Sequence, residues 1–191
     1  MRKWNSKDWY AGHGLQILLL VAPPGQGKST LAKYTLEIIR KESAEPPNCT
    51  ALEYFYQDSH GYNTAVTATQ SLLFQLLDEE ADLFEAIANR HQRLLSQKSE
   101  FNVYELWEVF ITALASCDIE NIYVVIDGLD ECEDVSQEVL WKTIEKNFVD
   151  SRAIDFSSGK RLRIFLTSRP TALARRISLL TTELEVQKSD V

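Results

Sequence analysis

The sequence is poor in the residues that build disulfide frameworks and metal centres. It has three cysteines, Cys49, Cys117 and Cys132, and no two of them form a C-x-x-C motif. An odd number of unpatterned cysteines predicts reduced thiols, not a disulfide-stapled fold. The three histidines do not stand beside these cysteines at the spacings that zinc sites use. We therefore expect no zinc site of the Cys/His type.

The 20 basic residues are outnumbered by 28 acidic ones, and long hydrophobic runs are scarce. The formal net charge of -8 argues against nucleic acid or an anionic membrane as the main partner, because both require a basic face. One short basic run, Lys160, Arg161 and Arg163, is a small candidate patch, and we interpret it as a solvated strand end. The apolar run at residues 17–24 is too short to span a bilayer, and residues 1–8 lack the apolar core of a signal peptide. These absences predict a cytoplasmic protein with no nucleic acid and no membrane as partner.

What the chain does contain is an alternation of strand-like and helix-like segments within 191 residues, a length that suits one domain. Nearly continuous apolar runs predict strands that are buried on both faces. Apolar residues in steps of three and four predict amphipathic helices. The alternation favours an α/β fold with a doubly wound parallel sheet. The predicted strands are 15–21, 50–56, 121–126, 162–167 and 181–186, and the predicted helices are 29–41, 64–77, 81–95, 102–116 and 135–148.

The segment from Ala22 to Ser29, APPGQGKS, matches the phosphate-binding P-loop except that Ala22 replaces the first glycine. In such a loop the backbone N–H groups and the helix N-terminus point at the β-phosphate, and the glycines allow a close approach. The lysine contacts the β- and γ-phosphates and the serine hydroxyl binds Mg²⁺. A glycine-rich turn before an ordinary helix is the simpler alternative, but the strand before and the helix after favour the P-loop. The predicted nucleotide-binding residues are Pro24, Gly25, Gln26, Gly27, Lys28, Ser29 and Thr30.

A second motif, VVIDGLDE, ends the predicted strand 121–126 with acidic residues. An apolar strand that ends in an aspartate is the second half of a P-loop site, where the carboxylate holds Mg²⁺ directly or through water. We therefore predict Ser29 and Asp127 as the metal-binding residues. Either Asp130 or Glu131 is then a candidate to orient the attacking water as general base. The alternative is that these acids only cap the helix that follows.

A third motif, FLTSRP, places Arg169 at the end of the predicted strand 162–167. A cation at that position is a candidate sensor of the γ-phosphate, and the alternative is a surface arginine at a strand end. Ligands in doubly wound sheets lie outside the carboxyl ends of the strands, where all three motifs fall. The sequence therefore predicts one site that binds a purine nucleoside triphosphate with Mg²⁺.

Together, the segments APPGQGKST, VVIDGLDEC and IFLTSRP make the chain similar to the NACHT group of STAND P-loop NTPases. The chain looks most like the fungal NLR-like proteins with a nephrocystin-3-like N-terminal NTPase domain, from about Trp4 to its end. The resemblance implies a three-layer sandwich with helices on both faces of a parallel sheet of about five strands in the order 5-1-4-3-2. It divides the chain into a lead-in segment, residues 1–14, and a NACHT-like NTPase domain, residues 15–191. It makes Lys28 and Ser29 the Walker A pair, Asp127 the Walker B acid, Asp130 and Glu131 the downstream acids, and Arg169 the residue called sensor 1.

The resemblance also implies binding of ATP or GTP with Mg²⁺, slow hydrolysis and a role as a signalling switch. Members of this group continue into helical and winged-helix subdomains and repeats, and they carry effector regions. We expect this chain, which ends at Val191, to lack those subdomains, so that self-association and effector contacts belong to a longer protein. Two alternatives stay open. One is a nucleotide-binding scaffold or truncated remnant that does not hydrolyse, and the other is a small-molecule or nucleotide kinase.

Overall fold

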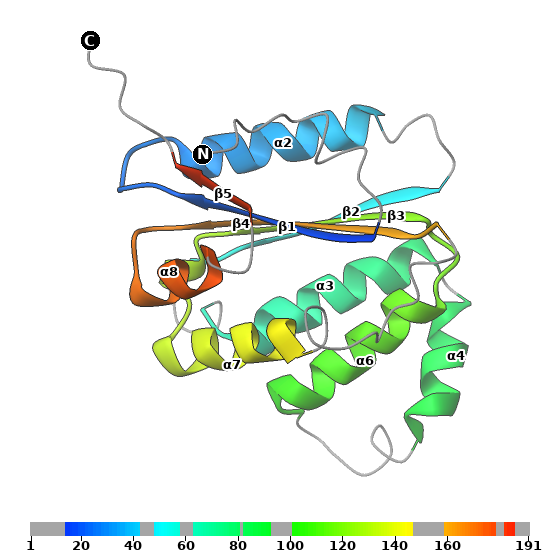
Figure 1. The fold of residues 1–191 in the computed structure, drawn as a ribbon. Helices are drawn as coiled ribbons and strands as arrows, with labels where there is room; N and C mark the ends of the chain where they lie inside the picture. Colours follow the sequence, from blue (N-terminus) through cyan, green and yellow to red (C-terminus); the bar gives the residue numbers. More distant parts are fainter. Residues whose placement is uncertain are drawn as a thin grey trace.

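Five parallel strands form one sheet between two layers of helices (Figure 1). The computed structural model describes residues 14–42, 48–57, 63–80, 82–92, 101–146, 159–178 and 182–185. The order across the sheet is β2-β3-β4-β1-β5, which is the predicted order read from the opposite edge. The strands are β1 (Gly14–Val21), β2 (Cys49–Phe55), β3 (Asn121–Asp127), β4 (Arg161–Ser168) and β5 (Thr182–Glu185).

The apolar pattern of each strand matches its place in the sheet. The inner strands β1, β3 and β4 have runs of four or more consecutive buried residues, because helices cover both faces there. The edge strand β2 instead alternates between buried and partly exposed positions. All five predicted strands are therefore confirmed, each within two residues of its predicted ends.

The two helical layers are unequal. One face of the sheet carries α2 (Lys28–Glu42), and the other carries the remaining helices that the structure describes (Figure 1). These are α3 (Ala65–Glu79), α4 (Leu83–Arg90), α6 (Val103–Ser116), α7 (Asp134–Ile144) and α8 (Ala172–Ser178). The prediction of helices on both faces is confirmed. The seven-residue helix α8 and a 3-10 turn at Leu129–Glu131 were not predicted, because segments this short show no helical period.

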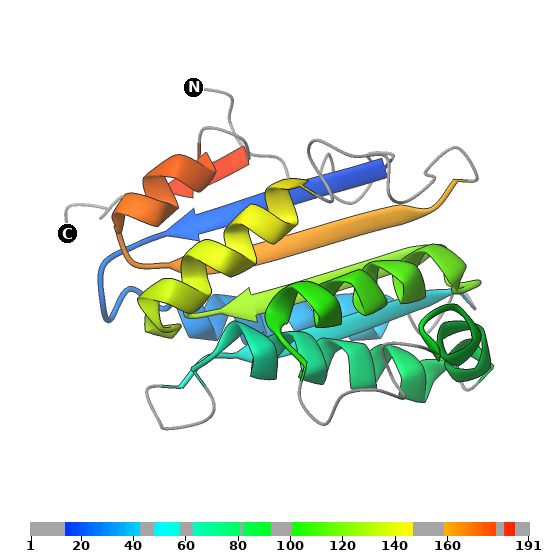
Figure 2. The same cartoon turned by 90° about the horizontal axis from the view of Figure 1, so that it is seen from below.

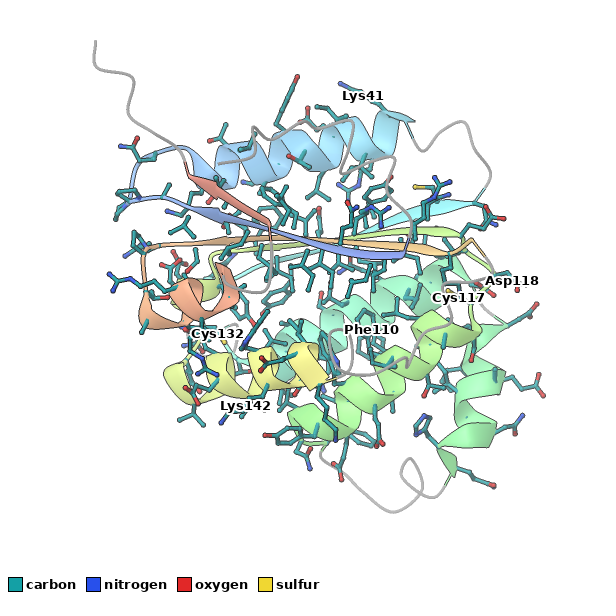
Figure 3. All side chains as sticks on the ribbon, viewed as in Figure 1. Lys41, Phe110, Cys117, Asp118, Cys132 and Lys142 are labelled. Carbon is teal, nitrogen blue, oxygen red and sulfur yellow. The ribbon has the colours of Figure 1, made fainter. Side chains whose placement is uncertain are left out.

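Each face of the sheet has its own hydrophobic core. The larger core lies between the sheet and the α3, α6 and α7 layer, and it includes Trp107 and Trp141, both nearly fully buried. Figure 3 shows Phe110 inside this layer, and the Trp107 and Phe110 rings meet edge to face with their centroids 5.4 Å apart. The smaller core holds α2 against the central strands. Among the described residues, no helix combines the length and apolar character that crossing a bilayer requires.

The basic run at the start of β4 corrects one expectation. Lys160 and Arg163 are buried, so they do not form a solvated strand end. The Lys160 ammonium donates hydrogen bonds to the carbonyl oxygens of Leu114 (2.8 Å) and Cys117 (2.7 Å), at the C-terminal end of α6. The Arg163 guanidinium donates to the carbonyl oxygens of Gly14 and Leu162. A cation at a helix C-terminus is stabilised by the helix dipole, so Lys160 serves the fold and presents no basic surface.

A glutamine on α3 closes part of the exposed edge of β2. The Gln75 side chain donates to the carbonyl oxygen of Glu53 (2.8 Å) and accepts from the Glu53 N–H (2.8 Å). Edge strands otherwise present unpaired backbone groups. The Gln75 amide thus takes the place that a further strand would occupy at this one residue.

Candidate functional site

The three motifs meet where the neighbouring strands β1 and β4 send their connections toward opposite faces of the sheet. Figure 2 shows the strand arrows pointing to one edge, where the segments after β1, β3 and β4 emerge. The chain after β1 enters α2 on one face, whereas the chains after β3 and β4 enter α7 and α8 on the other (Figure 1). Such a divergence opens a crevice at the carboxyl ends of the strands, which is where α/β folds bind ligands.

A cavity of about 380 Å³ lies in this crevice. This volume is within the range of small-molecule sites. Every residue that lines it comes from one of the three sequence motifs. The lining residues are Pro24, Gly25, Gly27, Lys28, Ser29, Thr30, Gly128, Asp130, Glu131 and Arg169. Two predicted site residues, Gln26 and Asp127, are not among the lining residues, and Asp127 is only 5% exposed.

The P-loop has the backbone that its glycines allow. Gly25 and Gly27 have φ angles of +74° and +77°, which residues with a side chain rarely adopt. No described residue other than glycine has a positive φ, so Ala22 fits the position of the missing first glycine. The Lys28 ammonium donates to the carbonyl oxygens of Ala22 (2.9 Å) and Pro23 (3.2 Å). Lys28 therefore lies across its own loop, at the cavity wall.

Arg169 is held by the acidic turn that follows β3. Its backbone N–H donates to Asp130 Oδ1 (2.8 Å), and its Nε lies 3.0 Å from Asp130 Oδ2. A second guanidinium nitrogen lies 3.7 Å from Glu131 Oε1. The Asp130 side chain is 7% exposed and that of Arg169 is 50% exposed. Asp130 thus uses both carboxylate oxygens to orient Arg169 at the cavity.

Thr167, which is not among the predicted site residues, connects the acidic turn to β4. The Thr167 hydroxyl lies 2.5 Å from Asp127 Oδ1 and accepts a hydrogen bond from the Gly128 N–H (2.9 Å). The sequence contains a weak signal for this contact, since Thr167 ends a strand and precedes Arg169 by two residues. Recognising it requires the pairing of β3 with β4, which brings Asp127 beside Thr167.

Tyr56 packs against the same turn from the end of β2. Its N–H donates to the carbonyl oxygen of Asp127 (3.0 Å), and its ring meets Tyr54 edge to face with centroids 4.9 Å apart. Burial, and secondarily the neighbouring Cys132, raise the pKa of the Tyr56 hydroxyl well above its ordinary value. Tyr56 is therefore a neutral, buried side chain that packs against the acidic turn.

The oxygen groups at the site fit Mg²⁺ better than a transition metal. Mg²⁺ in nucleotide sites is bound through one or two protein oxygens together with the phosphates. Ser29 supplies a hydroxyl at the cavity, and Asp127 supplies a carboxylate one residue before the lining residue Gly128. The described part of the chain contains no cluster of three or more His, Cys, Asp or Glu side chains able to hold a metal alone. The donor set therefore suits a cation that arrives with a nucleotide.

Comparison with known proteins places these features in a family. The family described as nephrocystin 3, N-terminal, matches residues 2–169 of the chain. The vegetative incompatibility protein HET-E-1 of Podospora anserina is 22% identical over 130 residues, which cover 66% of this chain and 9% of that protein.

Among solved structures, the ORC2 protein of Aeropyrum pernix, described in ADPNP–ADP complexes, is similar with a TM-score of 0.53 and 13% identity. The match covers 95% of this chain and 44% of the ORC2 chain. At this identity the likeness establishes the fold. The chain thus spans less than half the length of either protein.

Proposed function

This chain belongs to the nephrocystin 3 N-terminal family of P-loop NTPase-like domains, and from that premise we propose that it binds a purine nucleoside triphosphate with Mg²⁺ and hydrolyses it slowly. The observation that carries the proposal is the cavity that the three motifs line by themselves. It collects a lysine, a serine, two acids and an arginine from three separate segments, the first of which lies about a hundred residues before the second in the sequence. That is the set of groups that phosphoryl transfer from a nucleotide requires.

We assign the phosphates to the P-loop. The N–H groups of residues 24–30 precede and begin α2, so the helix dipole favours negative charge there. Lys28 is near enough to exchange its two carbonyl acceptors for phosphate oxygens, because it already lines the cavity. Ser29 and Asp127 are the proposed Mg²⁺ ligands, directly or through water. When bound, the cation neutralises charge on the phosphate oxygens.

We divide the roles of the two downstream acids by their contacts. Asp130 accepts from Arg169 with both oxygens, so we assign it the task of orienting that arginine. Glu131 lines the cavity at 3.7 Å from Arg169, and this position supports Glu131 as the group that orients the attacking water. Arg169 is the proposed sensor of the γ-phosphate.

Slow turnover follows from the number of arginines at the cavity. Among the residues that the structure describes, Arg169 is the one arginine in the lining, and Asp130 already binds it. An arginine supplied by a partner accelerates such reactions by about 10³–10⁵. We therefore propose that this chain is the NTPase module of a longer signalling protein. A partner, either a second copy or another domain, would supply the additional arginine. In this view residues 15–191 are the NTPase domain and residues 1–14 its lead-in.

Binding of a fluorescent ATP or GTP analogue, with and without EDTA, tests the proposal. We expect Mg²⁺-dependent binding that Lys28→Met abolishes. Lys33→Met is the matched control, because Lys33 lies on the same helix with its ammonium 5.6 Å from the centre of the Phe55 ring. Unchanged affinity in Lys28→Met contradicts the proposal.

Phosphate release then separates the proposed function from its alternatives. Nucleotide binding with no phosphate released over hours identifies a non-hydrolysing scaffold. Transfer to an added acceptor, faster than to water, identifies a kinase. The geometry gives little support to a kinase lid, because the adjacent pair Arg175 and Arg176 lies on α8, and Arg176 pairs with Glu138 on α7 at 3.3 Å.

A further inference from the structure

The third motif, at the end of β4, contacts the other two motifs through three consecutive residues. The Thr167 hydroxyl reaches Asp127 at the end of β3. The Ser168 carbonyl oxygen accepts from the N–H of Ala22, at the start of the P-loop, at 3.2 Å. The backbone and side chain of Arg169 bind Asp130. The central strand β4 therefore sets the relative positions of the three motifs.

The polarity of the Thr167 contacts is fixed. The Gly128 N–H donates to the Thr167 oxygen at 2.9 Å, because an N–H has no acceptor capacity. With its oxygen accepting from Gly128, the Thr167 hydroxyl uses its one proton to donate to Asp127 Oδ1 at 2.5 Å. Thr167 is fully buried and Asp127 is 5% exposed, so water does not compete for these contacts.

We propose that Thr167 is a positioning residue that fixes the Asp127 carboxylate so that its second oxygen, Oδ2, serves the Mg²⁺ of the bound nucleotide. The inference rests on the proposed function, since it concerns how this chain prepares for that cation. The same hydroxyl holds the N–H of Gly128, which has a φ of +77° and begins the turn that carries Asp130 and Glu131. One side chain thus orients both the metal-binding acid and the turn that carries the two downstream acids.

If Thr167 is a positioning residue, its loss should weaken the affinity for Mg²⁺ without changing nucleotide binding in the absence of Mg²⁺. Groups that orient a metal ligand typically change metal affinity by about 10–100-fold when they are removed. In Thr167→Val, which keeps the shape of the side chain and removes the hydroxyl, we expect the Mg²⁺ concentration at half-maximal binding of a fluorescent ATP analogue to rise by about that factor. Binding of the analogue in EDTA stays as in the unmodified chain. Thr167→Ser retains the hydroxyl and restores the Mg²⁺ midpoint.

A buried threonine on α3 supplies the matched control. Thr69 is also fully buried, and its hydroxyl donates to the carbonyl oxygen of Ala65 at 2.7 Å. Thr69→Val removes a buried hydroxyl from a helix that contributes no residue to the cavity lining, so we expect its Mg²⁺ midpoint to stay unchanged. If Thr167→Val does not fold, Thr167→Cys takes its place, because a thiol of similar size is a weaker donor.

The outcomes separate this inference from the proposed function. An unmodified chain that shows no Mg²⁺-dependent binding overturns the proposed function and the inference with it. The inference alone is overturned if the unmodified chain shows a clear Mg²⁺ midpoint and Thr167→Val, or a folded Thr167→Cys, does not change that midpoint. A midpoint that Thr167→Ser shifts as far as Thr167→Val does also overturns it, because the hydroxyl is then not the feature that matters.

Discussion

The backbone of the P-loop allows a quantitative test at a single glycine. Gly27 has a φ of +77°, and a Cβ added there meets no atom within 4 Å. Replacing Gly27 by alanine therefore introduces no clash in this structure. The whole cost is the backbone conformation, since a left-handed residue with a Cβ is less stable by about 1–2 kcal/mol.

The open surroundings decide where that cost is felt. Gly27 lies on an exposed loop at the cavity, so the loop can leave the left-handed conformation without unfolding the sheet. The phosphate-binding shape then becomes a minor state, and the apparent dissociation constant rises by the inverse of its population. A cost of 1–2 kcal/mol corresponds to about 5–30-fold weaker nucleotide binding. Because bound phosphates approach the same loop, this factor is a lower bound.

Calorimetric titration of an ATP analogue into Gly27→Ala measures the effect, and chemical denaturation checks that the fold is retained. Gly159→Ala is the matched control, because Gly159 also has a positive φ (+91°), with no atom within 4 Å of an added Cβ, but does not line the cavity. We expect Gly159→Ala to leave nucleotide affinity unchanged. Unchanged affinity in Gly27→Ala would refute the reasoning, because the left-handed conformation would then not be needed for binding.

Two further predictions concern stability. Lys160→Met should lower the free energy of unfolding by about 3 kcal/mol in urea denaturation, because it removes two hydrogen bonds from a buried ammonium to the end of α6. Lys142 is exposed, so Lys142→Met should change the free energy of unfolding little. Equal effects of the two substitutions would contradict the assigned role of Lys160. Burial raises the pKa of Tyr56, so above about pH 10 the unfolded chain releases a proton that the folded chain keeps, and stability falls as pH rises by up to about 1.4 kcal/mol per pH unit. Urea titrations from pH 8 upward should show a flatter fall of stability with pH in Tyr56→Phe. The fall should be retained in Tyr104→Phe, because the Tyr104 ring is exposed. If the fall is unchanged in Tyr56→Phe, groups other than Tyr56 cause it.

Much of the fold was predictable because its signals are local. The inner strands are continuous apolar runs, and the helices of fourteen or fifteen residues show clear periods. The P-loop is a contiguous motif with a strand before it and a helix after it. The strand order, in contrast, came from the resemblance to a family, since periodicity alone does not say which strands are neighbours.

The features that sequence reasoning missed depend on contacts between distant segments. The basic run at Lys160 was interpreted as a solvated strand end, whereas the end of α6, more than forty residues earlier, makes Lys160 a buried cap. The contact of Thr167 with Asp127 depends on the pairing of β4 with β3, which the sequence does not reveal. Asp130 was predicted as a candidate base, and its binding to Arg169 became visible only when two turns were brought together. In each case the residue type was visible in the sequence, but its partner was not.

The amide of Gln75 has a mechanical consequence for the whole molecule. Apolar packing between a helix and a sheet resists separation but permits sliding, because it has little directional preference. The paired hydrogen bonds between Gln75 and Glu53 are directional, and they fix α3 at one point along the strand axis. α3 in turn packs on α6 and α7, and Lys160 attaches the end of α6 to the start of β4 through hydrogen bonds that are equally directional. Force applied to these helices would therefore reach the sheet at two defined places, the edge strand β2 and the central strand β4, which lie on either side of the strand that ends in Asp127.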